Sequence, residues 1–232
     1  MSGRPVRIKL CGLRTLEDAR AAHAAGADLL GFVLAESQRQ LAPGTVAGIV
    51  MALAAESAAA GGPAPLTVGV LGEGDLSVLA AQARAARVTA VQVALNATPD
   101  RCMQLGAELG LPVIGVYHVH DGELSSAELE LLLDACDLVI LDAPSMQGGG
   151  SGQRFDHAAL GVAGRSARLG VAGGLTPGDV GELVRRYAPA LVDVSSGIET
   201  SGRKDPALMR AFVAAVRAAC EAPLQEGTPH HG

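Results

Sequence analysis

Short apolar runs recur along the whole chain and alternate with longer segments in which apolar residues have helical spacing. The runs are rich in Val, Ile and Leu at consecutive positions, which is typical of strands buried on both faces of a sheet. Eight such runs lie at residues 6–11, 29–34, 66–71, 88–94, 112–119, 138–142, 168–173 and 191–196. The pattern therefore predicts eight strands in a parallel sheet.

The segments between the runs begin with residues that commonly cap helices. The side chain of Thr or Asp can accept a hydrogen bond from the first free amides of a helix. The candidate caps are Thr15, Asp75, Thr98, Thr176 and Asp205. We expect helices within residues 15–26, 43–62, 75–86, 98–110, 125–136, 176–188 and 205–220, and a further short helix around 155–160.

Eight strand-helix units in 232 residues predict an α/β protein with the closed (β/α)₈ (TIM) barrel fold in a single domain. An open, doubly wound sheet is the alternative. We expect the barrel domain to span residues 1–222 and the polar tail 223–232 to be disordered. Residues 56–65 are rich in Ala, Gly and Pro, and we interpret them as a loop and not as a domain boundary.

The composition argues against several classes of binding partner. The net charge of -6 and the absence of any run of Lys and Arg argue against nucleic acid. The four cysteines are widely spaced, which argues against a disulfide framework and a zinc site and favours a reducing compartment. No apolar run approaches the roughly 18 to 20 residues that cross a bilayer. We therefore expect a soluble, cytoplasmic protein that binds neither membrane nor metal.

The carboxyl ends of barrel strands are where active sites lie. Polar or reactive residues expected there are Cys11, Arg39, Glu73, Asn96, His118 or His120, and Asp142. From the residues alone, Cys11 fits a buried structural thiol as well as a catalytic one. Arg39 fits a solvated loop residue or a ligand for a carboxylate. Asp142 fits a loop cap or a general acid.

Two loop types add further predictions. The runs at 168–173 and 191–196 end in Gly or Ser directly before a helix or turn. Unhindered amides near a helix start bind anions, and these are the loops with which barrels bind phosphate. We therefore expect a phosphate site, although either loop alone fits a simple tight turn. The glycine-rich loop 144–153 is a candidate lid, which would desolvate Asp142 and keep its carboxyl protonated.

Five segments together resemble the phosphoribosylanthranilate isomerase family of tryptophan biosynthesis. They are KLCGL (9–13), AGADLLGFVLAESQRQ (25–40), VILDAPSMQGGGSGQRFD (139–156), VAGGLTPGDV (171–180) and VDVSSGIETSGRKD (192–205). They occur in the family's order and span almost the whole chain. The resemblance implies an Amadori rearrangement of N-(5'-phosphoribosyl)anthranilate to 1-(2-carboxyphenylamino)-1-deoxyribulose 5-phosphate, without a cofactor.

The resemblance also implies a role for each matching residue. Asp142 would be the general acid that protonates the furanose ring oxygen, and Cys11 would be the general base that removes the C2' proton. Arg39 would hold the anthranilate carboxylate, and Asp193 would lie near the sugar hydroxyls. The phosphate would lie among Gly173, Gly174, Ser196 and Gly197.

One segment departs from the family pattern. The fourth strand of the family usually ends in Gln-Leu-His-Gly and an acid, whereas this chain has Gln-Val-Ala-Leu-Asn at residues 92–96, with Ala94 in place of the histidine. His118 or His120 could fill the vacated space. Three functions stay open: the ordinary isomerase, a diverged isomerase for another phosphoribosyl amine or aminosugar in specialised metabolism, and a non-catalytic phosphosugar-binding protein. We expect a monomer or a homodimer.

Overall fold

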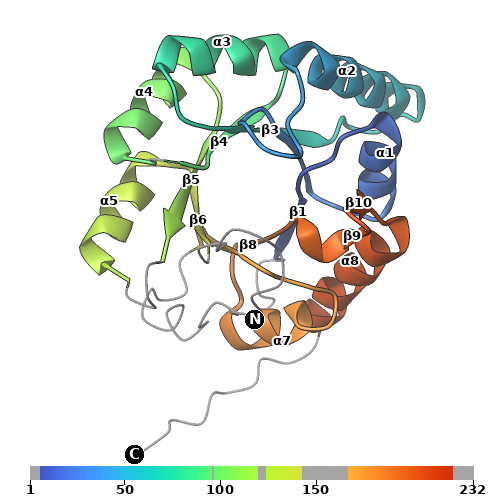
Figure 1. The fold of residues 1–232 in the computed structure, drawn as a ribbon. Helices are drawn as coiled ribbons and strands as arrows, with labels where there is room; N and C mark the ends of the chain where they lie inside the picture. The colour runs from blue at the N-terminus through green and yellow to red at the C-terminus, as the bar shows by residue number, and fades with distance from the viewer. Residues whose placement is uncertain (1–5, 96, 120–123, 143–166, 222–232) are drawn as a thin grey trace, which may run out of the picture.

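The structure is a computed structural model, and it describes residues 6–95, 97–119, 124–142 and 167–221. Eight parallel strands form a closed ring in chain order (Figure 1). They are β1 (Arg7–Leu10), β2 (Leu29–Val33), β3 (Leu66–Leu71), β4 (Ala90–Val93), β5 (Val113–His118), β6 (Leu138–Asp142), β7 (Leu169–Ala172) and β8 (Leu191–Val194). β1 pairs with both β2 and β8, so the sheet has no edge. The predicted TIM barrel is confirmed, and the open sheet is excluded.

Helices surround the ring on its outer side (Figure 1). They are α1 (Leu16–Ala24), α2 (Pro43–Ala59), α3 (Leu76–Ala86), α4 (Pro99–Leu109), α5 (Ser126–Ala135), α7 (Val180–Tyr187) and α8 (Pro206–Glu221). After β8 the chain forms a 3₁₀ turn, η1 (Ser196–Ile198), and a small hairpin of β9 (Glu199–Thr200) and β10 (Arg203–Lys204). The helix predicted around 155–160, the loop 144–153, Asn96, His120 and the tail 223–232 lie outside the described residues.

Several predicted caps fix the helix starts. Thr15 accepts a bond from the Asp18 amide at 3.1 Å, and the Asp18 carboxylate accepts one from the Thr15 amide at 3.3 Å, which forms a capping box on α1. Thr98 accepts a bond from the amide of Arg101 at 3.4 Å and caps α4. Asp205 caps α8 in the same way, because its carboxylate accepts the Ala207 amide at 2.8 Å.

Two other helix starts differ from the prediction. Asp75 precedes α3 but makes no side-chain capping bond. Thr176 does not begin α7, because the Asp179 carboxylate accepts the Thr176 amide at 2.7 Å and folds residues 176–179 into a turn. The helix therefore begins only at Val180. The predicted loop 56–65 is also partly wrong, since α2 continues to Ala59.

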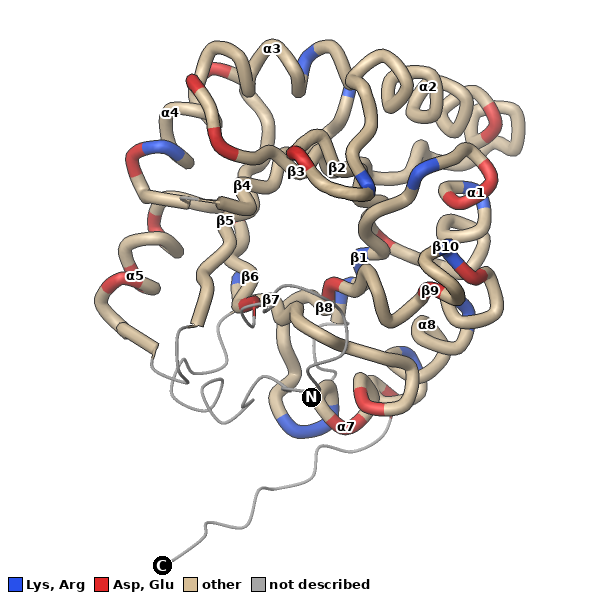
Figure 2. The backbone as a smooth tube through the Cα atoms, in the orientation of Figure 1, with Lys and Arg blue, Asp and Glu red and all other residues tan. Residues whose placement is uncertain are grey.

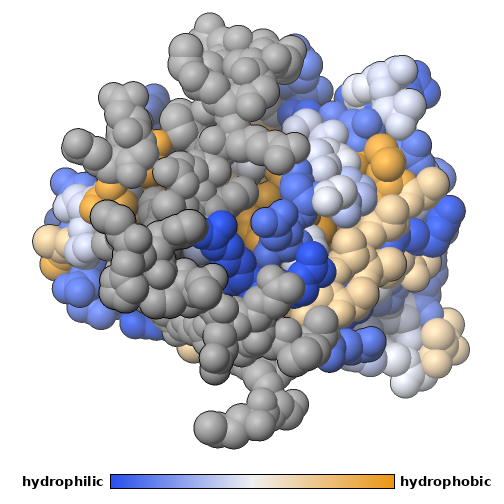
Figure 3. Space-filling model, turned by 90° about the horizontal axis from the view of Figure 1, so that it is seen from below, coloured by the Kyte–Doolittle hydropathy of each residue, from blue (hydrophilic) through white to orange (hydrophobic). Residues whose placement is uncertain are grey.

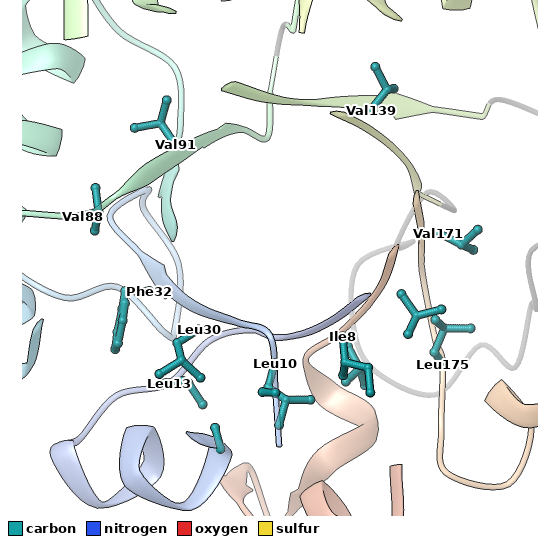
Figure 4. Packing of buried hydrophobic residues seen from close by; sticks show 14 of the residues in the cluster. Ile8, Leu10, Leu13, Leu30, Phe32, Val88, Val91, Val139, Val171 and Leu175 are labelled. Atoms are coloured by element: carbon teal, nitrogen blue, oxygen red, sulfur yellow. The ribbon is translucent and has the colours of Figure 1, made fainter. Parts of the chain in front are cut away.

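Side chains alternate between the two faces of the barrel wall. Ile8, Leu10, Leu30, Val91 and Val139 are buried and point outward to the helices (Figure 4). Their strand neighbours therefore point inward, because successive side chains of a strand face opposite sides. A second buried cluster fills the barrel interior and comprises Leu29, Val68, Ala90, Ile114, Val116, Leu138, Ile140, Ala172 and Leu191.

Towards the carboxyl ends of the strands the inward positions become polar. Gln92, His118, Asp142 and Asp193 each lie two residues beyond a member of the inner cluster and so share its face. Lys9 lies between the outward-pointing Ile8 and Leu10. The barrel interior thus changes from apolar to polar over two residues of each of these strands. This change marks the mouth of the barrel, where chemistry can occur.

Charged residues are otherwise concentrated on the outer helices and loops (Figure 2). On the side of α7 and α8 the described surface mixes hydrophilic with hydrophobic residues (Figure 3). Within the described ranges, no helix combines the length and the apolar composition needed to cross a membrane.

Candidate active site

Cys11 stands at the carboxyl end of β1 and faces the barrel interior. Its amide donates to the Val194 carbonyl at 2.8 Å, so the pairing of β1 with β8 continues as far as Cys11. The residue is 8% exposed. A Cβ at Gly31 would lie 2.8 Å from the Cys11 sulfur, so the missing side chain on β2 provides the space for the thiol. The prediction that Cys11 lies at the mouth agrees with this position.

A buried ion pair lies directly beside this thiol. Lys9 is completely buried, and its ammonium donates to Asp193 Oδ2 at 2.7 Å. Asp193 is 8% exposed, and its other oxygen, Oδ1, has no hydrogen-bond partner among the described residues. Burial lowers the pKa of Lys9, but the charges of Asp193 and Cys11 raise it more, so the net pKa lies above its ordinary value. Lys9 is therefore a protonated cation at the bottom of the mouth.

The same burial and charges also shift the pKa of Cys11, but for this thiol burial has the larger effect. Burial raises the pKa of the thiol, because a thiolate loses its hydration there. Lys9 lowers that pKa through its charge, Asp193 raises it, and Lys204 lowers it by a smaller amount. The net direction is upward, so the surrounding cations oppose but do not cancel the cost of burial.

A second group of charged side chains, Arg39, Glu199 and Lys204, lies at the mouth after β8. Arg39 donates two bonds to Glu199, at 2.8 and 2.9 Å. Lys204 forms an ion pair with the same carboxylate at 2.8 Å and donates to the Ser195 carbonyl at 2.8 Å. The β9–β10 hairpin sets this geometry, because Lys204 and Glu199 are partners in its register. The Arg39 side chain, 32% exposed, is thus held by Glu199, which the sequence-based prediction did not anticipate.

Arg39 nevertheless reaches the region next to Cys11. A Cβ at Gly12 would lie 2.6 Å from Arg39 Cδ and 2.8 Å from Ser195 Oγ, so the arginine stem crosses the backbone beside the thiol. Gly12 also has a φ of 73°, which favours glycine. The guanidinium is therefore placed within the mouth by a glycine and an ion pair.

The ion pairs of Glu199 lead to a prediction about stability and pH. The bonds from Arg39, opposed by burial and aided by Lys204, lower the pKa of Glu199 from 4.5 to about 2. A lowered carboxylate pKa stabilises the fold above pH 4.5, and this contribution is lost as pH falls from 4.5 towards 2. After a discount for solvent screening of the partly exposed Arg39, its size is on the order of 1 to 2 kcal/mol. We expect Glu199→Gln to lower the free energy of urea unfolding at pH 7 but to have little effect near pH 2.

Glu56→Gln provides the control, because Glu56 pairs with Arg20 at 2.6 Å on the surface, where each side chain is nearly half exposed. Exposed pairs contribute little, so this variant should unfold like the wild type at both pH values. An equal loss of stability for Glu199→Gln at neutral and acidic pH would contradict the assigned cause.

Asp142 lies on β6, which is separated from β1 by β7 and β8. It is level with His118 on β5 and with Ala172 on β7 in the strand register. Residues that are level on neighbouring strands project to the same face, so Asp142 and His118 are neighbours at the mouth. The structure therefore brings Asp142 and Cys11 to the same end and the same inner face of the barrel.

His118 reaches from β5 across to β4. Its Nε2 lies 2.8 Å from the Ala94 carbonyl oxygen. A carbonyl only accepts, so Nε2 carries the proton and a neutral ring presents Nδ1 as an acceptor. The imidazole thus lies against the position at which the family pattern has a histidine and this chain has Ala94.

The two glycine-rich loops predicted to bind phosphate contact each other. Gly173 and Gly174 follow β7 with φ values of 97° and 62°. This left-handed conformation strains any residue with a side chain. Gly197, in η1 after β8, packs so closely that a Cβ there would overlap the Leu175 carbonyl oxygen. Ser196 precedes it, so the predicted four residues lie on two touching loops at the mouth.

Sequence reasoning missed Lys9, Glu199 and Lys204. Lys9 had a readable signal, since it is a cation within the apolar run 6–11 and lies two residues before Cys11, on the same strand face. Glu199 and Lys204 had no such signal, because only the hairpin brings them together.

Comparisons with known proteins place this site in a family. The family model described as N-(5'phosphoribosyl)anthranilate (PRA) isomerase matches residues 8–215. A relative from Rhodospirillum rubrum, named N-(5'-phosphoribosyl)anthranilate isomerase, is 38% identical over 221 residues, which cover 90% of this chain and 97% of the relative.

Solved structures agree. The phosphoribosyl anthranilate isomerase of Thermus thermophilus superposes with a TM-score of 0.77 at 28% identity, covering 92% of this chain and 99% of the other. Another phosphoribosyl anthranilate isomerase, solved in complex with reduced 1-(o-carboxyphenylamino)-1-deoxyribulose 5-phosphate, has a TM-score of 0.72 at 26% identity with the same coverage. The chain belongs to the N-(5'-phosphoribosyl)anthranilate isomerase family.

Proposed function

We propose that the protein isomerises N-(5'-phosphoribosyl)anthranilate to 1-(2-carboxyphenylamino)-1-deoxyribulose 5-phosphate by general acid and base catalysis. The observation that carries the proposal is the position of Cys11 and Asp142 on the inner face of one barrel mouth, above a buried Lys9–Asp193 pair. Family membership supports the substrate. The reaction moves protons within one molecule and has no net redox change, so it needs no cofactor.

In the proposed mechanism Asp142 protonates the ring oxygen of the furanose, and the bond from this oxygen to C1' breaks to give an iminium ion. Cys11, as the thiolate, removes the proton from C2', and the electron pair of that C–H bond forms the C1'–C2' double bond of an enolamine. Protonation at C1' and loss of the C2' hydroxyl proton then give the ketone. The acid and the base each contribute about 10² to 10⁴ in rate.

The remaining residues would bind the substrate. Asp193 Oδ1, which has no partner among the described residues, is a suitable acceptor for a sugar hydroxyl. Arg39 would bind the anthranilate carboxylate by its fork of donors, in exchange for part of its contact with Glu199. We propose that the phosphate lies at the touching loops, among Gly173, Gly174, Ser196 and Gly197.

A second candidate is a diverged isomerase with a different phosphoribosyl amine or aminosugar. The observation in its favour is His118, which lies against Ala94 and alters the lining of the mouth beside Asp142. We propose that the protein acts in the cytoplasm as a monomer or homodimer, and that phosphorylated sugar, not nucleic acid or membrane, is its partner.

Complementation tests the function. We expect the gene to restore growth without tryptophan to a bacterial strain that lacks this isomerase, while the same gene carrying Asp142→Asn should not. Failure of well-expressed wild-type protein would reject the ordinary substrate. Titration with the reduced product analogue would then separate the two alternatives: tight binding without turnover indicates a non-catalytic binding protein, and no binding indicates another substrate.

A further inference from the structure

The proposed acid-base mechanism gives no role to several of the charged side chains near Cys11. Lys9 lies on β1, Asp193 on β8, Glu199 on β9, Lys204 on β10, and Arg39 on the segment between β2 and α2. Ion pairs connect Lys9 to Asp193, and both Arg39 and Lys204 to Glu199. Within this cluster the cations outnumber the carboxylates by one, so a thiolate at Cys11 would make it neutral.

We propose that Lys9 is a positioning residue that makes the Cys11 thiolate easier to form than burial alone would allow, and that Asp193 limits how much of the lysine charge reaches the sulfur. The proposal rests on the role of Cys11 as the base. Lys9 precedes Cys11 by two residues in an extended strand, so both side chains project to the same inner face.

Burial strengthens the electrostatic effect of Lys9 on the Cys11 thiolate. An ammonium without water around it acts on a neighbouring charge through a low dielectric, where Coulomb interactions are much stronger than in solvent. Lys9 is 0% exposed, whereas the Arg39 side chain is 32% exposed and is screened by water. The upward shift of the Lys9 pKa, caused in part by the Cys11 charge, agrees with this arrangement.

Lys204 is less suited to this role. Its ammonium is already bonded to the Glu199 carboxylate and the Ser195 carbonyl, each at 2.8 Å. The Lys9 ammonium, by contrast, donates to the Asp193 carboxylate, and Asp193 uses only Oδ2 for this bond. A sugar hydroxyl that donates to Asp193 Oδ1 would draw charge away from Lys9 and leave more of the lysine field for the thiolate. Substrate binding would in this way strengthen the base.

Opposite substitutions of the two partners test the proposal. The probe is the ultraviolet absorbance of the thiolate in the full-length protein as a function of pH, with the signal of Cys11→Ser subtracted to remove the other cysteines. Lys9→Met should raise the pH at which the Cys11 thiolate forms by at least about one unit, because the cation that favours the thiolate is gone. Asp193→Asn should lower that pH, because the opposing carboxylate is gone and the cation remains.

Activity gives a second readout. If Cys11 is the base, the loss in kcat/KM of Lys9→Met should be recovered as pH rises and the thiolate forms. Lys9→Met leaves Asp193 buried without its partner and could unfold the protein. The double variant Lys9→Met/Asp193→Asn avoids that charge, and its Cys11 thiolate should still form at a higher pH than in the wild type, because the effect of Lys9 exceeds that of Asp193.

Two results would overturn the proposal: an unchanged Cys11 titration in Lys9→Met or in the double variant, or shifts in the same direction for Lys9→Met and Asp193→Asn, which would indicate only structural damage. The titration requires no turnover. An inactive wild type would therefore reject the proposed function, while the titration would still decide whether Lys9 controls the thiol.

Discussion

Asp142→Asn should lower kcat/KM by at least about a hundredfold, because an amide of the same shape cannot supply the proton that opens the furanose ring. Asp142 lies at the last position of β6, held in register between His118 and Ala172. The strand fixes its backbone, so the substitution should leave the barrel intact. The measurement is steady-state kinetics, with thermal unfolding followed by circular dichroism to establish that the fold is retained.

Asp134→Asn is the matched control. Asp134 belongs to α5, its side chain is 83% exposed, and its contact with Arg168 is 4.0 Å long. Removing this charge should change neither rate nor stability. If Asp142→Asn were as mild as the control, Asp142 would not be the general acid, and its place at the mouth would reflect a loop cap instead.

Cys11→Ser should produce a loss of similar size, at least about a hundredfold in kcat/KM. A serine hydroxyl has nearly the shape of the thiol but does not ionise at neutral pH, so it cannot act as the base. The space beside Gly31 accommodates either atom, and we expect the unfolding temperature to change little. Kinetics and circular dichroism again provide the two measurements.

Cys220→Ser controls for the chemical change alone, since Cys220 is exposed near the end of α8. Its activity should equal that of the wild type. Substantial residual activity in Cys11→Ser would show that another group removes the C2' proton and would reject the assignment of the base.

The outcomes for individual residues show what a sequence can predict. The strand positions followed from consecutive apolar runs, because a parallel sheet buries both of its faces. Cys11, Asp142 and the two glycine loops followed from one rule, which places function at the carboxyl ends of barrel strands. The helix start at Thr176 was assigned wrongly: its hydroxyl accepts the Gly178 amide at 3.2 Å, as a cap would, but within a turn that precedes α7.

The charged lining of the mouth was less predictable. The contact of Arg39 with Glu199 joins residues 160 positions apart, and only the closed ring brings them together. Lys9 and Asp193 are 184 positions apart but become level in the register of β1 and β8. Local patterns predict which strand face a residue occupies. They do not identify its partner on the next strand.

The most direct test of the central claim is a crystal structure of the protein with the reduced product analogue that occupies a solved relative. The account predicts the Cys11 sulfur against C2' of the sugar chain, the Asp142 carboxyl within hydrogen-bonding distance of the oxygen released from the ring, and the phosphate at the loops of Gly174 and Gly197. An analogue bound with either group out of reach of those atoms would contradict it.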